Sequence, residues 1–126
     1  LQELFHDPSR LPVDNLRAAA EDVVINSRDR GYRLAVAACA RHLAGERAHG
    51  KHGYWSRLVD LQVPSFWVWG DRDRLVSHRY AERVTERLPH AQVEVWHHVG
   101  HVPQFEVPER TNRSLHDFIG RIEAGL

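Results

Sequence analysis

The sequence feature that most constrains the fold is a short run of aromatic and β-branched residues at positions 65–69, which ends at Gly70. A run of this length that ends in glycine predicts a fully buried strand of a parallel sheet. A second short strand is expected where Val93 and Val95 alternate with polar residues before Trp96. Helical patterns lie between and after these strands. The order strand, helix, strand, helix predicts a βαβ unit with a closing helix, and therefore an α/β fold class.

The two helices of this unit have recognisable boundaries. Ser77 is expected to cap the first helix, which Pro89 ends. Pro108 fits the first turn of the closing helix. The apolar side chains expected on one face are Tyr80, Ala81, Val84 and Leu88 in the first helix, and Leu115, Phe118, Ile119 and Ile122 in the second. Two parallel strands are too few to be stable alone, so we expect this unit to be a portion of a larger sheet.

Residues 1–53 have a different composition, rich in Ala and Arg, and their pattern predicts helices. One helix should start with Asp14 as its capping residue, and a second should run from near Arg30 to Ala44. The buried side of this second helix is expected to comprise Leu34, Ala37, Ala38 and Cys39. We therefore divide the chain into two domains, residues 1–53 and residues 54–126.

Charge and hydropathy limit the kinds of partner and the cell compartment that we expect for this chain. The 17 Lys and Arg residues balance the 17 Asp and Glu residues, so no overall field attracts nucleic acid or an anionic membrane. The longest apolar stretch, residues 34–40, is far shorter than the roughly 20 residues needed to span a bilayer. The chain has no recognisable signal peptide and a single cysteine, Cys39. We therefore expect a cytoplasmic protein without nucleic-acid or membrane partners.

Chemistry is expected in two loops, residues 70–77 and 97–103, because each follows the carboxyl end of a strand. A carboxylate from the first loop and an imidazole from the second can meet there. Together they would form the acid–histidine half of a nucleophile–histidine–acid system. Asp71 and Asp73 are the candidate carboxylates. Each also has a purely structural interpretation, as an aspartate that bonds to its own loop.

The histidines of the second loop also raise the possibility of a metal site, because His97 and His101 have the His-x-x-x-His spacing. In this chain, however, they straddle a strand end and a glycine turn rather than one helix face. His97 and His98 should moreover point to opposite faces of a strand. We therefore expect no metal ligands.

Two segments carry a resemblance to the α/β-hydrolase fold family. Residues 63–76 resemble its V-P-x-hydrophobic-run-G-x-x-D segment, and residues 99–109 are similar to its terminal G-H-x-x-x-x-E-x-P-E segment. The resemblance implies that Asp73 is the triad acid and that His101 is the general base. It also implies that residues 1–53 are a helical cap and that residues 54–126 are the C-terminal part of the hydrolase core. Val102 and Phe105 follow the histidine and are expected to contact substrate.

The nucleophile of such a triad is missing from the sequence. In this family it belongs to a G-x-S-x-G elbow or its aspartate counterpart, which should precede the cap. None of the serines has glycines at both flanking positions. The chain also contains no methionine and opens on Leu1, so it is not expected to be an intact translation product. We expect a fragment that is inactive alone and whose partner is the missing N-terminal half of the same enzyme.

The resemblance implies hydrolysis of a small, largely apolar ester or carbon–carbon bond substrate through a covalent intermediate, without a cofactor. Epoxide and haloalkane hydrolysis stay open, because the distinguishing nucleophile is absent. An alternative is a non-catalytic truncated module that pairs with itself, as a homodimer or domain swap, or with another chain. An unpaired strand at residues 66–69 would be the site of that pairing. For the enzyme, the Asp73 carboxylate should lie within hydrogen-bond reach of the His101 imidazole.

Overall fold

The computed structural model describes residues 3–125 and divides into two compact units. The first, here called the sheet unit, spans Leu1–Arg10 and Val59–Leu126. The second, the helical unit, spans Leu11–Leu58. Residues 3–10 therefore belong with the sheet unit, and the Leu4 carbonyl accepts a hydrogen bond from the His101 N–H at 2.8 Å. The role of a cap, which the sequence suggests for residues 1–53, stays a prediction.

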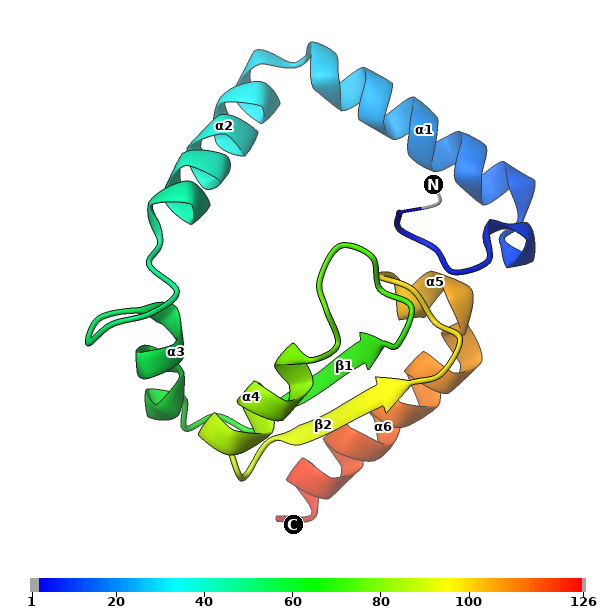
Figure 1. Cartoon of the computed structure of the whole chain (residues 1–126). Coiled ribbons are helices and arrows are strands. Elements are labelled where there is room, and N and C mark those ends of the chain that lie inside the picture. Colours follow the sequence, from blue (N-terminus) through cyan, green and yellow to red (C-terminus); the bar gives the residue numbers. More distant parts are fainter. Residues whose placement is uncertain (1–2, 126) are drawn as a thin grey trace. The chain divides into compact units, whose positions relative to one another are not determined.

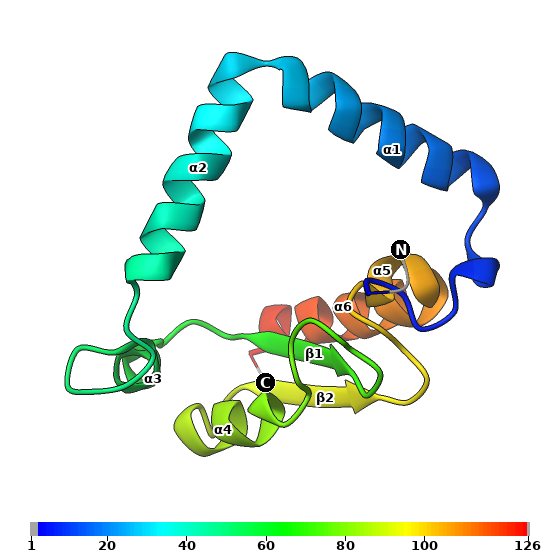
Figure 2. The same cartoon turned by 45° about the horizontal axis from the view of Figure 1, so that its top comes forward.

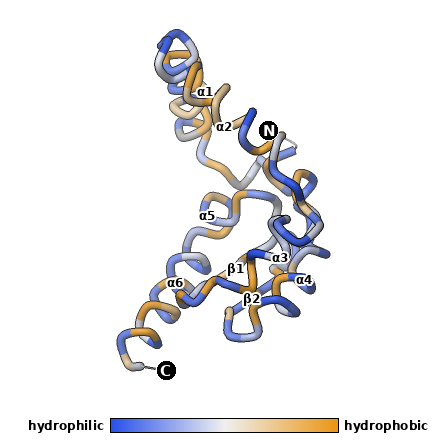
Figure 3. The backbone as a smooth tube through the Cα atoms, turned by 90° about the vertical axis from the view of Figure 1, so that its left-hand side faces the viewer, coloured by the Kyte–Doolittle hydropathy of each residue, from blue (hydrophilic) through white to orange (hydrophobic). Residues whose placement is uncertain are grey.

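The sheet unit contains two parallel strands, β1 (Phe66–Gly70) and β2 (Gln92–Trp96). Their register pairs Phe66 with Gln92 and Gly70 with Trp96, so both strands end at the same level. Helix α4 (Tyr80–Arg87) connects them, and α5 (Pro103–Glu106) and α6 (Pro108–Glu123) follow. Helices α4 and α6 lie on opposite faces of the sheet (Figures 1 and 3). The predicted order of strand, helix, strand, helix and the α/β class are confirmed.

The core of the sheet unit lies between the sheet and its helices. Val84 of α4 and the following Leu88 are fully buried, as are Trp96 at the end of β2 and Val99 in the next loop. On the other side of the sheet, Phe66 stacks on Phe118 of α6 with ring centroids 5.6 Å apart. The guanidinium of Arg110, also on α6, lies 4.3 Å from the centroid of the Trp96 ring. Contacts on both faces therefore fix the strands from which the two expected loops emerge.

Strand β1 is less buried than its sequence predicts. Residues 66–69 are only partly buried, and Gly70 is the one fully buried position of the strand. In the described part of the chain the sheet has two strands, so β1 has a neighbour on one side only. The side chains of α6 that should cover the sheet are also largely exposed, namely Leu115, Ile119 and Ile122. The apolar side chains of β1 and α6 are thus more numerous than the described chain buries.

The start of α1 (Val13–Arg28) differs from the prediction. Pro12 occupies the N-cap position, and Asp14 lies in the first turn without a capping hydrogen bond from its side chain. The fixed φ of proline already suits a helix entrance, so the helix begins two residues earlier than a capping Asp14 would require. Asp14 is still favourably placed, because a negative charge in the first turn complements the helix dipole.

The start of α4 differs in the opposite direction and lies later than predicted. Arg79 occupies the N-cap position of α4, whereas the expected cap, Ser77, lies two residues before it. The Ser77 hydroxyl accepts a long hydrogen bond, 3.4 Å, from the Arg79 backbone N–H. A turn at residues 77–79 thus takes the place of the predicted first helical turn. A polar pattern alone does not distinguish these two local conformations, because the serine bonds a nearby N–H in both.

The helical unit also contains α2 (Arg30–Gly45), α3 (Tyr54–Arg57) and the first residue of a 3-10 turn at Leu58–Asp60. Another 3-10 turn, Pro8–Arg10, precedes the unit. Asp29 caps α2 by accepting the Tyr32 N–H at 2.7 Å. The expected burial of one α2 face is wrong, since no residue of this helix is buried and Cys39 is exposed. Within the helical unit, α2 contacts α1, and this one helix is not enough to cover that face (Figure 2).

Candidate active site

The loops after β1 and β2 are joined by backbone hydrogen bonds. The Asp71 N–H donates to the Trp96 carbonyl at 2.9 Å, and the Arg72 N–H donates to the Val99 carbonyl at 3.0 Å. These bonds continue the pairing of the strands beyond the edge of the sheet. The two loops therefore form one connected platform at the carboxyl ends of the strands, where α/β proteins carry their functional groups.

Gly70 permits this close approach. A Cβ atom at position 70 would lie 2.0 Å from the Val99 carbonyl oxygen and 2.3 Å from that of Gly100. Both neighbours are backbone atoms, which cannot rotate away as a side chain can. The glycine before the aspartates thus stops the strand and also lets the second loop pack directly against it.

Asp73 and His101 lie side by side on this platform. One carboxylate oxygen, Oδ2, is 2.9 Å from Nδ1 of the imidazole. The other, Oδ1, accepts the backbone N–H groups of Leu75 and Val76, each at 2.9 Å. The Asp73 side chain is only 4% exposed, whereas the imidazole is 35% exposed. A fixed carboxylate therefore faces a histidine that remains open to solvent, within the hydrogen-bond reach that the sequence predicts.

This geometry suits proton transfer. When Nδ1–H donates to the carboxylate, the neutral tautomer leaves Nε2 as the basic nitrogen. The two bonds from Leu75 and Val76 also show that Asp73 is a turn-forming aspartate. The structural and the chemical interpretations are thus compatible, because each uses a different oxygen of the same carboxylate.

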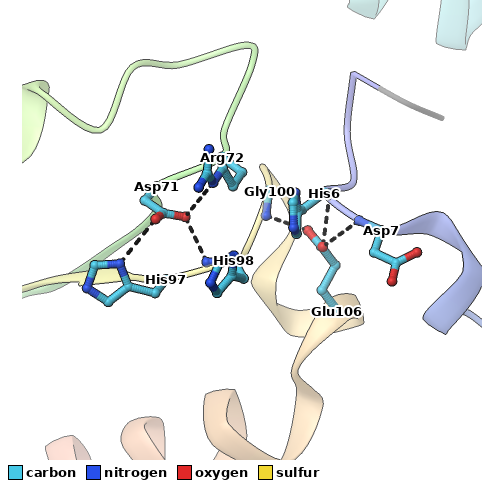
Figure 4. A network of polar contacts seen from close by, with 8 residues as sticks. All are labelled: His6, Asp7, Asp71, Arg72, His97, His98, Gly100 and Glu106. Carbon is cyan, nitrogen blue, oxygen red and sulfur yellow. Dashed lines mark hydrogen bonds and ion pairs between the residues drawn. The ribbon is translucent and has the colours of Figure 1, made fainter.

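Asp71 faces different partners. Its Oδ2 lies 3.1 Å from Nδ1 of His97, and its Oδ1 accepts the His98 backbone N–H at 2.8 Å (Figure 4). Burial by itself would raise the pKa of Asp71, but these two hydrogen bonds and the nearby Arg72 charge lower that pKa below its ordinary value of 3.8. Asp71 therefore binds its neighbouring loop, as its structural interpretation predicts, and does not meet His101.

The prediction that His97 and His98 point to opposite faces of a strand is wrong. Strand β2 ends at Trp96, and both histidines lie in the turn that follows it. His98 adopts a positive φ of 58°, a left-handed conformation that reverses the chain direction. Within residues 3–125, no group of three or more His, Cys, Asp or Glu side chains is arranged to hold a metal ion.

Glu106 is a further polar residue of this platform to which the sequence analysis assigns no function. Its side chain is 6% exposed, and its Oε1 accepts the Gly100 N–H at 2.6 Å. Its Oε2 accepts the N–H groups of His6 at 2.9 Å and Asp7 at 3.4 Å (Figure 4). The sequence signal that could have singled it out is its place in the G-H-x-x-x-x-E segment, five residues after His101. Its partners at residues 6 and 7 lie too far away in sequence to be foreseen.

The two predicted substrate-contacting residues follow His101 in the chain, Val102 directly and Phe105 four residues later. Val102 is partly buried at the N-terminus of α5, and Phe105 within that helix is 56% exposed. A large exposed aromatic side chain is suited to an apolar contact. Contact of either residue with a substrate stays a prediction.

The sequence of the chain matches the family model described as alpha/beta hydrolase fold over residues 9–108, which is most of its length. The chain belongs to the α/β-hydrolase fold family. The matched residues include the whole platform, from Gly70 through Asp73 to His101 and Glu106. In residues 3–125, the structure contains no helix long and apolar enough to cross a membrane.

Several known proteins are similar to parts of this chain. A 2-hydroxy-6-oxononadienedioate/2-hydroxy-6-oxononatrienedioate hydrolase of Paraburkholderia phymatum is 37% identical over 68 residues, which are 54% of this chain and 24% of that protein. Lipase 3 of a Moraxella species is 39% identical over 54 residues, covering 43% of this chain and 17% of that protein. The chain therefore spans about a quarter or less of the length of these relatives.

A solved structure resembles nearly the whole chain. The crystal structure of a membrane phospholipase A, described as a bacterial virulence factor, superposes with a TM-score of 0.70. The match covers 98% of this chain and 36% of the phospholipase chain, at 23% sequence identity. This likeness supports the fold, and its low identity carries no statement about substrate.

Proposed function

We propose that this chain supplies the acid and the base of a hydrolase triad whose nucleophile lies outside it. The observation that carries the proposal is the Asp73–His101 pair, a nearly buried carboxylate 2.9 Å from a partly exposed imidazole. Membership of the α/β-hydrolase fold family and relatives named as a hydrolase and a lipase support the same conclusion. The chain alone is expected to be inactive.

In the proposed mechanism, Asp73 holds the Nδ1–H of His101 and stabilises the imidazolium that forms. Nε2 takes the proton of the nucleophile hydroxyl as its oxygen bonds to the substrate carbonyl carbon. His101 then returns this proton to the leaving group as the bond to that group breaks. Water, activated by the same nitrogen, releases the covalent intermediate. If the nucleophile is instead an aspartate, His101 acts in the water step alone. No cofactor takes part in either route.

The substrate class we propose is a small, largely apolar ester or a compound cleaved at a carbon–carbon bond. Val102 and Phe105 would contact its apolar part, since they lie at the N-cap of α5 and within this short helix, in the segment that follows His101. The helical unit would act as the cap of the complete enzyme. The missing N-terminal half would contribute the nucleophile and the remaining strands.

Substitution of His101 tests this function in the polypeptide encoded by the complete reading frame. With a p-nitrophenyl butyrate substrate, His101→Ala should lower kcat/KM by about 10³-fold, because general acid–base catalysis contributes factors of this order. His97→Ala is the matched control and should leave the rate nearly unchanged, since His97 contacts Asp71 instead of Asp73. Equal rates for His101→Ala and the unsubstituted polypeptide would refute the proposal.

A second candidate function is a non-catalytic module that pairs through a strand edge. It is favoured by the sheet of the described residues, in which β1 and β2 each have one neighbour and residues 66–69 are only partly buried. An open strand edge can pair with another chain. Sedimentation velocity of the 126-residue chain separates the two ideas. A stable dimer, with a complete reading frame that encodes no nucleophile elbow, would favour the module.

A further inference from the structure

Glu106 is a buried carboxylate that the proposed triad chemistry does not use. We propose that Glu106 is a positioning residue, which fixes residues 4–7 against the His101 loop and so holds the imidazole in line with Asp73. This inference rests on the proposed function in one respect: the alignment of His101 with Asp73 matters for catalysis only if the two residues belong to a triad. The set of hydrogen bonds that join residues 4–7, Gly100, His101 and Glu106 is called the latch below.

The first support is that the two oxygens of the Glu106 carboxylate bind different segments. Oε1 binds the N–H of Gly100, next to His101, whereas Oε2 binds the N–H groups of His6 and Asp7. One side chain therefore ties together two segments that are about 100 residues apart in sequence. Both oxygens must be acceptors for this, and an ionised carboxylate offers two acceptor oxygens where an amide offers one. With only 6% of the residue exposed, water cannot replace a lost bond easily.

The second support is a hydrogen bond that closes the latch. The backbone N–H of His101 donates to the carbonyl of Leu4 at 2.8 Å. The segment that Glu106 holds is thus the segment that holds the His101 backbone. Release of residues 4–7 from Glu106 would therefore weaken the constraint that the Leu4 carbonyl places on the His101 backbone.

The third support is the tight fit around Gly100. A Cβ atom at this position would lie 2.6 Å from the His6 nitrogen and 2.7 Å from Oε1 of Glu106. It would also lie 2.8 Å from the Leu4 carbonyl oxygen. The glycine before the histidine therefore leaves just enough room for the latch, which links this position of the G-H motif to its later glutamate.

The latch can affect chemistry because the partner of the imidazole is fixed independently. Asp73 is held by the N–H groups of Leu75 and Val76, on the other loop. Alignment of the two side chains therefore depends on where the His101 backbone lies. Because hydrogen bonds weaken steeply with poor angles, a modest displacement of that backbone would disrupt the bond between Nδ1 and Oδ2.

Nitrogen NMR of the histidine rings tests this role in the 126-residue chain. In the unsubstituted chain near pH 8, the ring of His101 should show a single Nδ1–H tautomer, which its bond to Asp73 selects. In Glu106→Gln, the spectrum should move toward a mixture of both tautomers, as in Asp73→Asn. The matched control is Glu109→Gln, an exposed glutamate in the first turn of α6, which should leave the His101 signals unchanged.

Amide hydrogen exchange supplies a second readout that needs no substitution. In the unsubstituted chain, the N–H groups of His6, Gly100 and His101 should exchange more slowly than in an unfolded peptide by about tenfold or more. Exchange of His6 at the unfolded rate would overturn the proposal, even if Glu106→Gln fails to fold. A folded Glu106→Gln chain with an unchanged His101 tautomer would also overturn it, because Glu106 would then have a structural role alone.

The two proposals fail separately. Neither NMR readout depends on a nucleophile or on turnover. If the latch is observed while His101→Ala leaves hydrolysis unchanged in the complete polypeptide, the proposed function fails and the latch stands as a structural device. If hydrolysis requires His101 but the His101 tautomer is the same in Glu106→Gln as in the unsubstituted chain, the latch alone is refuted.

Discussion

At the scale of single residues, three carboxylates of the platform have different partners. Asp73 meets an imidazole, Asp71 binds the turn at His97 and His98, and Glu106 binds backbone N–H groups alone. The approach of Asp73 to His101 could be predicted, because parallel strands bring their following loops to one edge. The bonds of Glu106 could not, since no periodic pattern relates its position to that of His6.

Asp71 should make the stability of the chain depend on acid pH. Its pKa is lowered in the folded state, so its contribution is fully present above the unfolded pKa of about 3.8 and is lost as pH falls through the lowered value. At pH 7, Asp71→Asn should lower the free energy of unfolding by about 1 kcal/mol, the usual contribution of a hydrogen bond.

Urea denaturation at a series of pH values measures this effect. The difference in unfolding free energy between the unsubstituted chain and Asp71→Asn should shrink as pH falls below about 4. A difference that grows below about pH 4 would contradict the assignment of a lowered pKa to Asp71.

At the scale of elements, the type and order of the helices and strands follow from the sequence, whereas burial and helix starts do not. The run at residues 66–69 is apolar enough for a central strand, yet it is only partly buried, because the sheet of the described residues gives it a neighbour on one side only. The apolar pattern of a strand indicates the surroundings in which it would be buried. Those surroundings can include other parts of a longer polypeptide. Helix starts at Val13 and Tyr80 depend on local turns that compete with capping.

Gly70→Ala should disrupt the platform more than an equal change in a helix. The added Cβ would meet two carbonyl oxygens at 2.0 and 2.3 Å, so the loops after β1 and β2 must separate. We expect a loss of about 2 kcal/mol or more in the free energy of unfolding, within the range for overpacked sites.

The control is Gly120→Ala in α6, where a Cβ would meet nothing within 4 Å. This change should stabilise the helix by about 0.5–1 kcal/mol, because alanine is the better helix former. Thermal unfolding of both variants checks the pair. Equal stability of Gly70→Ala and the unsubstituted chain would contradict the close approach of the loops.

At the scale of the whole molecule, the chain combines a family fold with an acid–histidine pair and a sequence that lacks a nucleophile elbow. It belongs to the α/β-hydrolase fold family, and its sheet unit carries an acid–histidine pair. The same unit leaves apolar side chains of α6 exposed. The sequence predicts the acid–histidine pair and the missing nucleophile, because it contains the two strand-end motifs and lacks a nucleophile elbow, but it does not predict the exposure of α6. The full set of strands and the nucleophile are what our account assigns to the longer polypeptide.

A comparison of Asp73→Asn with Asp71→Asn tests the central claim most directly. Both changes remove one charge from the same loop, but only Asp73 contacts His101. In the polypeptide encoded by the complete reading frame, kcat/KM for ester hydrolysis should fall on the order of 10³–10⁴-fold in Asp73→Asn, because the histidine loses the carboxylate that fixes its tautomer. Asp71→Asn should retain the rate within a few-fold. Similar rates for the two variants would contradict the assignment of Asp73 and His101 as the catalytic pair.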